Sequence, residues 1–148
     1  MRFNFRLRYA LYAAFSTLFI SGALWLAADS LKDGPDGESW QAISANLLMV
    51  HGGMAMVTLM LFGAIVPIHL LRAWRAKRNR WTGSVMVVLN AILIITAFGL
   101  YYFGGEEVRP WMSNVHLGAG FALPLLLFSH ILCGRVTRPR ACGRLPLG

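Results

Sequence analysis

Four histidines stand at the ends of two long apolar stretches of this chain, and the chain has no others. One stretch runs from His51 to His69, and the other runs from His116 to His130. Imidazole is the commonest metal ligand in proteins, and ionisable side chains at membrane depth are candidates for function by default. The histidines are therefore the candidate ligands of a metal or of a cofactor that contains one.

The spacing within each stretch predicts where the side chains point. An α-helix turns about 100° and rises about 1.5 Å per residue. His51 and His69 are 18 residues apart, which is about five whole turns, so both are expected on one face. His116 and His130 are 14 residues apart and are expected within about 40° of one direction. Each stretch therefore predicts a helix with a histidine stripe.

The two spacings differ by about one helical turn. Helix tilt, or a kink at Pro67 or Pro124, would absorb this difference. Otherwise one of the two inner ligands is misassigned, and His69 is the histidine most affected.

Composition indicates a membrane protein. Hydrophobic residues make up 57% of the chain and charged residues 14%, about half the usual charged share. Four apolar runs each reach the length of roughly 20 residues that a helix needs to cross a bilayer: 9–28, 47–71, 85–103 and 111–133. Backbone groups in lipid must be satisfied within the segment, so these runs predict helices. We expect one all-α domain over residues 1–148, a transmembrane antiparallel four-helix bundle.

The start of the chain also resembles a secretory signal with a small-residue cleavage site. Its apolar run, residues 9–28, is longer than the apolar region of such a signal. We therefore expect it to be retained as the first membrane helix.

The distribution of charge predicts the orientation. Twelve of the 14 basic residues lie before the first run, between the second and third, or after the fourth. All six acidic residues lie on the other side: Asp29, Asp33, Asp36, Glu38, Glu106 and Glu107. By the positive-inside rule both termini are cytoplasmic, which fits a multi-pass protein of the bacterial inner membrane. The basic pI reflects this topology and attraction to anionic lipid, and the sequence shows no nucleic-acid-binding motif.

The topology sorts the histidines by depth. Both stretches enter the membrane from outside, so His51 and His116 are outer and His69 and His130 are inner. The second and fourth helices of a four-helix bundle face each other across its core, where cofactor sites are built. Two facing imidazoles suit the axial positions of a haem iron. The sequence therefore predicts two haem b groups, with no C-x-x-C-H motif for covalent attachment.

Other residues fit this arrangement. Ala55 and Gly120 are small residues beside the outer pair and leave room for a flat macrocycle. Arg72 lies one turn beyond His69 and is placed for an inner haem propionate, while Arg109 could serve the outer haem. Three residues of the third run could line the haem side of the bundle or pack between helices, and packing is favoured: Asn90, Thr96 and Gly99.

Two other readings of the histidines stay open. They could be interfacial or packing residues, a reading better suited to one histidine than to two depth-matched pairs. They could also bind copper for transport together with methionines, since thioether and imidazole suit that metal. However, Met49, Met56 and Met60 project away from His51, so we interpret them as lipid-facing or packing residues that act as apolar filler.

The stretch HLGAGFALPLLLFSH, residues 116–130, resembles the di-haem transmembrane cytochromes b. These include quinol-oxidising cytochrome b and the small cytochrome b561-type and formate-dehydrogenase-gamma-type subunits. The resemblance covers all four runs and implies that His51, His69, His116 and His130 ligate haem. Two features depart from it: the 18-residue spacing in the second run, and the lack of a histidine in the first run.

The expected function is electron transfer across the membrane. The resemblance implies a membrane subunit that links a periplasmic redox partner, such as a cytochrome c or a dehydrogenase subunit, to the quinone pool. An alternative is a self-contained quinone-linked oxidoreductase of the superoxide oxidase or metal reductase type. A non-haem metal transporter is a third possibility. No catalytic residue is assigned in any of them.

Overall fold

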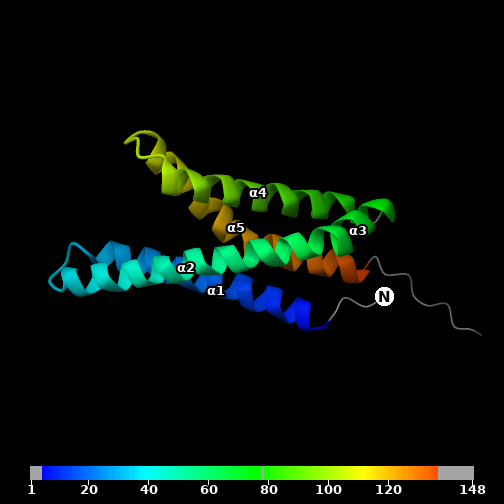
Figure 1. Cartoon of the computed structure of the whole chain (residues 1–148), viewed down its shortest axis with the longest axis horizontal. Helices are drawn as coiled ribbons and strands as arrows, with labels where there is room; N and C mark the ends of the chain where they lie inside the picture. Colours follow the sequence, from blue (N-terminus) through cyan, green and yellow to red (C-terminus); the bar gives the residue numbers. More distant parts are fainter. Residues whose placement is uncertain (1–4, 78, 137–148) are drawn as a thin grey trace, which may run out of the picture. The chain divides into compact units, whose positions relative to one another are not determined.

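The computed structural model describes residues 5–77 and 79–136 (Figure 1). The described residues form helices and turns and contain no strand. The elements are α1 (Phe5–Leu31), α2 (Gly37–Ile65), the π-helix η1 (Val66–Leu70), α3 (Leu71–Arg75), α4 (Arg80–Tyr102) and α5 (Val108–Val136). The all-α prediction is confirmed, and the four long helices contain most of each predicted apolar run.

Four of these helices are long and apolar enough to cross a membrane: α1, α2, α4 and α5. They have 23 to 29 residues, with mean hydropathies between 1.6 and 2.2. Large apolar side chains stand exposed along them, among them Ile95 at 63% and Leu125 at 72%. A water-soluble protein rarely exposes so much contiguous apolar surface, whereas a lipid bilayer solvates it. The chain is a multi-pass membrane protein.

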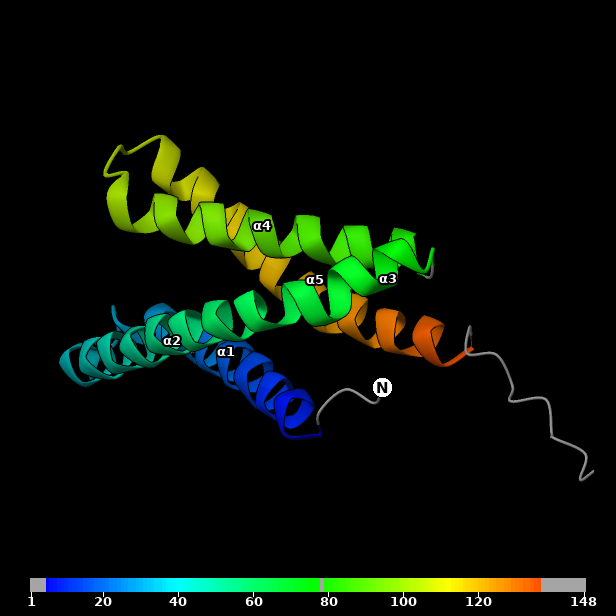
Figure 2. The same ribbon diagram turned by 45° about the vertical axis from the view of Figure 1, so that its right-hand side comes forward.

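The chain divides into two units, residues 1–69 and 70–148, each described by itself. In the first, α1 and α2 lie side by side as a helical hairpin (Figures 1 and 2). Its turn is closed by backbone bonds of 3.1 Å from the Gly34 N–H to the Leu31 carbonyl and from the Gly37 N–H to the Gly34 carbonyl.

Small side chains form the seam of this first hairpin. Ala14, Ser21 and Ala28 are buried on α1 and recur every seven residues, or about two turns. On α2 the same interval separates Ser44, His51 and Thr58. Small residues along such a stripe let two membrane helices approach closely. His51 therefore lies in the packing seam of its own hairpin.

The second unit contains the hairpin of α4 and α5 (Figures 1 and 2). Gly99 is buried on α4, and a Cβ there would lie 3.1 Å from the Met112 sulfur of α5. On α5, His116, Leu123 and His130 again recur every seven residues. Both histidines of the second stretch thus lie on one stripe, and its central residue, Leu123, is buried.

The π-helix η1 changes the expected direction of His69. Pro67 lies within η1 and has no N–H to donate to the preceding turn. A π-turn holds about one residue more than an α-turn, so the 18-residue interval is no longer a whole number of turns. The prediction that the two point the same way assumes an unbroken α-helix, and η1 does not meet that assumption. Pro124, in contrast, lies inside an uninterrupted α5.

Candidate functional site

His51 is held by two groups of α1. Its Nδ1 lies 3.0 Å from the Leu18 carbonyl oxygen and 3.1 Å from the Ser21 hydroxyl. A carbonyl only accepts hydrogen bonds, so the Nδ1–H is the donor and the lone pair of the neutral ring lies on Nε2. Gly22 makes room for the ring, because a Cβ there would stand 3.2 Å from His51 Cε1.

His116 is held in the same way within the second hairpin. It is half-buried on α5, and its Nδ1 lies 2.9 Å from the Thr96 hydroxyl of α4. Thr96 is only 4% exposed. The bond therefore lies in the seam between the two helices, away from the lipid-facing side of either.

His130 has a third hydroxyl partner. Its Nδ1 lies 3.0 Å from the hydroxyl of Thr82, which is in the first turn of α4. His51, His116 and His130 thus each contact the first helix of their own hairpin through Nδ1. This fixes the direction of each ring relative to that helix.

His69 differs from the other three. It lies in η1 rather than in a regular helix, and its side chain is exposed. Its role as a ligand stays a prediction. The pairing of His51 with His116 and of His69 with His130 joins the two hairpins and also stays a prediction from the sequence.

The hydroxyl partners were not identified from the sequence. The sequence pattern does not point to Ser21 or Thr82, and it favours a packing role for Thr96. A signal for them exists, however. Thr96 and His116 each lie ten residues from position 106, in the turn of the second hairpin, and Thr82 and His130 each lie 24 residues from it. In a helical hairpin, residues at equal distances from the turn lie at one depth.

The remaining predicted site residues are placed as follows. Ala55 and Gly120 are half-buried, and a Cβ added to Gly120 would meet no atom of the described residues within 4 Å. Arg72 and Arg109 are exposed, Arg72 in α3 and Arg109 in the first turn of α5. Asn90 donates to the Met86 carbonyl of its own helix.

The three methionines of α2 opposite His51 face outward, as expected of lipid-facing side chains. Met49, Met56 and Met60 are 72%, 67% and 77% exposed, which confirms that they lie on the side of α2 away from the seam. Among the described residues, no group of three or more His, Cys, Asp or Glu side chains is arranged to hold a metal ion. A bis-histidine haem needs only two protein ligands for its iron.

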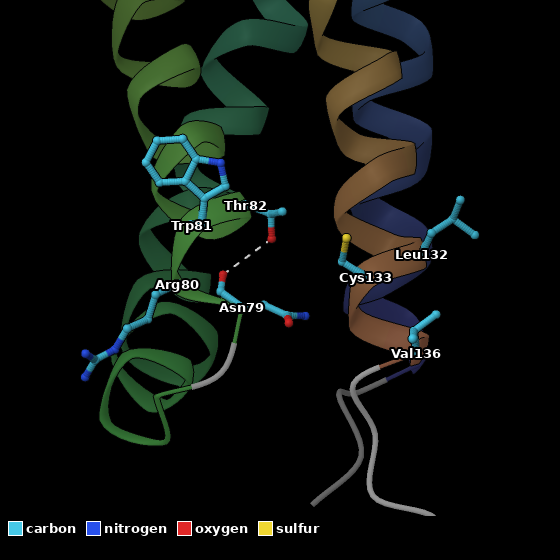
Figure 3. A pocket seen from close by; sticks show the side chains of 7 residues that line it. All are labelled: Asn79, Arg80, Trp81, Thr82, Leu132, Cys133 and Val136. Atoms are coloured by element: carbon cyan, nitrogen blue, oxygen red, sulfur yellow. Dashed lines mark hydrogen bonds between the residues drawn. The ribbon is translucent and has the colours of Figure 1, made fainter.

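A pocket of about 430 Å³ lies between the start of α4 and the end of α5 (Figure 3). Asn79 and Thr82 extend toward α5, whereas Arg80 extends away from it (Figure 3). The other lining residues are Trp81, Leu132, Cys133 and Val136. Because Thr82 also contacts His130, the pocket adjoins the partner of the inner candidate ligand.

Comparisons of the chain with protein-family models, with curated proteins and with solved structures find no match.

Proposed function

We propose that the chain transfers electrons across the membrane through two non-covalent haem b groups. His51 and His116 hold the outer haem, and His69 and His130 hold the inner one. The observation that carries this proposal is the shared use of Nδ1 by His51, His116 and His130 to contact the neighbouring helix. The opposite ring nitrogen, Nε2, is the proposed ligating atom in each of the three.

The donor set fits a haem iron. Histidines that ligate metals usually bind a second group through their other ring nitrogen, which fixes the tautomer and the ring orientation. A haem iron takes two axial protein ligands, as each proposed pair supplies. Bound haem supplies one-electron chemistry, while the protein supplies binding, orientation and electrostatics. Ala55 and Gly120 would leave room for the macrocycle, and Arg72 and Arg109 would pair with propionates.

The side of the membrane on which a redox partner would dock follows from charge. With both termini cytoplasmic, the loop after α1 and the turn after α4 face the periplasm of a bacterial inner membrane. The acidic residues of these two segments, among them Asp33, Asp36 and Glu107, are complementary to a basic face on a cytochrome c or a dehydrogenase subunit. The quinone pool in the membrane is the proposed second partner.

The pocket beside Thr82 favours a second candidate function. Its volume of about 430 Å³ falls within the usual range for small-molecule sites. If a quinone headgroup binds there, the chain could act as a self-contained quinone-linked oxidoreductase of the superoxide oxidase or metal reductase type. Steady turnover of the purified chain with quinone and an external substrate, and without any partner protein, would support this candidate.

The test of the main proposal is a reduced-minus-oxidised spectrum of the detergent-purified full chain, with haem quantified per chain. We expect two haem b groups, and one after His51→Ala or His116→Ala. Ser129→Ala is the control, because Ser129 is next to His130 but donates to the Leu125 carbonyl of its own helix. Absence of haem from the wild-type chain would refute the proposal and leave the non-haem reading.

A further inference from the structure

The hydroxyl partners of the histidines form a pattern of their own. Thr82 and Thr96 are 14 residues apart on α4, the same interval that separates His130 from His116 on α5. Each threonine lies as far from the hairpin turn as the histidine that it contacts. In the first hairpin, Ser21 and His51 are likewise both 15 residues from Asp36, at the end of the turn. In both hairpins, a hydroxyl of the first helix contacts a histidine of the second helix that lies at the same distance from the turn.

The protons of these hydroxyls determine which partner donates. Thr96 Oγ1 donates to the Ile92 carbonyl at 2.7 Å, and Ser21 Oγ donates to the Thr17 carbonyl at 2.7 Å. A hydroxyl has one proton and two acceptor lone pairs. Since that proton is already engaged, each oxygen is an acceptor toward its histidine. With the Thr96 proton on the Ile92 carbonyl, the Nδ1 of His116 carries the proton. The Leu18 carbonyl independently requires the same tautomer for His51.

The inner position is less strongly determined. Thr82 Oγ1 lies 3.4 Å from the Asn79 carbonyl, which is at the limit of a hydrogen bond. Its proton is therefore more weakly engaged than that of Thr96. For this reason the argument is strongest for the outer histidines, His51 and His116.

We infer that Ser21 and Thr96 are positioning residues that hold His51 and His116 as Nδ1–H tautomers, so that Nε2 is the ligating nitrogen of each. The claim that Nε2 ligates haem rests on the proposed function. The claim that each ring is the Nδ1–H tautomer concerns the chain alone. Donation from Nδ1–H raises the basicity of a ligating imidazole. Loss of such a partner typically lowers metal affinity by about 10- to 100-fold.

Thr58 offers a matched control. It is 4% exposed, as Thr96 is, and its Oγ1 donates to the carbonyl four residues earlier, Met54, at 2.7 Å. Replacing either threonine with valine keeps the shape and removes one buried hydroxyl. The two variants differ in that the Thr96 hydroxyl also contacts a histidine.

The experiment uses the full chain in detergent, labelled with ¹⁵N-histidine and purified without haem. Four histidines give few signals, and His116→Gln assigns that of His116. The ¹⁵N shifts of the ring report its tautomer. We expect the Nδ1–H form for His116 in the wild type, in Thr96→Ser and in Thr58→Val, and a mixture of tautomers in Thr96→Val. Haemin is then added, and its dissociation constant at the outer site is measured.

Three results separate support for the inference from failure of the inference and from failure of the proposed function. Loss of the single tautomer and a 10- to 100-fold weaker haemin affinity in Thr96→Val, both restored in Thr96→Ser, would support the inference. An unchanged tautomer in Thr96→Val would overturn it, whatever the haemin affinity. If haemin binds to no variant, the proposed function and the haem part of the inference fail, while the tautomer result still decides the role of Thr96.

Discussion

The contact between Gly22 and His51 leads to a quantitative prediction that does not depend on haem. A Cβ at position 22 would lie 3.2 Å from His51 Cε1 and 3.4 Å from its Nδ1. The ring would have to move by a few tenths of an ångström. That movement disturbs its bonds to the Leu18 carbonyl and the Ser21 hydroxyl, because both engage the same nitrogen.

Two opposing effects set the magnitude for Gly22→Ala. Replacing a glycine inside a helix with alanine stabilises the helix by roughly 0.5–1 kcal/mol. Overpacking a well-packed position costs typically about 1–3 kcal/mol. At Gly53 of α2, a Cβ would meet no described atom within 4 Å, so Gly53→Ala has only the first effect. The two variants should therefore differ by about 1–3 kcal/mol in the free energy of unfolding.

The assay is unfolding of the full chain in mixed micelles with increasing sodium dodecyl sulfate, followed by tryptophan fluorescence. Trp25 lies three residues beyond Gly22 on α1 and reports on the first hairpin. We expect Gly53→Ala to unfold later than the wild type and Gly22→Ala to unfold earlier. Equal shifts of both variants in one direction would refute the packing of His51 against Gly22.

Three further predictions concern other parts of the chain. His130→Ala should reduce haem from two groups to one, measured by pyridine haemochrome assay; unchanged haem content would remove His130 from the ligands. Arg80→Gln should weaken the contact between α3 and the start of α4 by about 1 kcal/mol in detergent unfolding. Arg80 donates to the Trp74 carbonyl at 2.9 and 3.2 Å and lies over the Trp74 ring; the exposed Arg75→Gln is the control. A cysteine at Ser30, in a chain lacking Cys133 and Cys142, should react with an impermeant maleimide from the periplasm; labelling only in inverted vesicles would reverse the topology.

The sequence by itself determined the helical fold and the membrane environment. Long apolar runs can only be helical in lipid, because every backbone hydrogen bond must close within the segment. The 14-residue interval between His116 and His130 also follows from the sequence, and seven residues, about two α-helical turns, return nearly to one face. Even so, the helices extend beyond the apolar runs: α2 begins at Gly37, ten residues before its run.

Only the tertiary structure decided the partners of the histidine rings and the direction of His69. Thr96 and His116 are 20 residues apart, and Ser21 and His51 are 30 apart, so their contacts depend on the length of each turn and on the register of each hairpin. The π-turn at Pro67 likewise depends on which backbone hydrogen bonds form locally, and the apolar pattern of the sequence does not predict this. Periodicity assumes a regular helix and treats each helix alone, and so it predicts neither a change in register nor a bond between two helices.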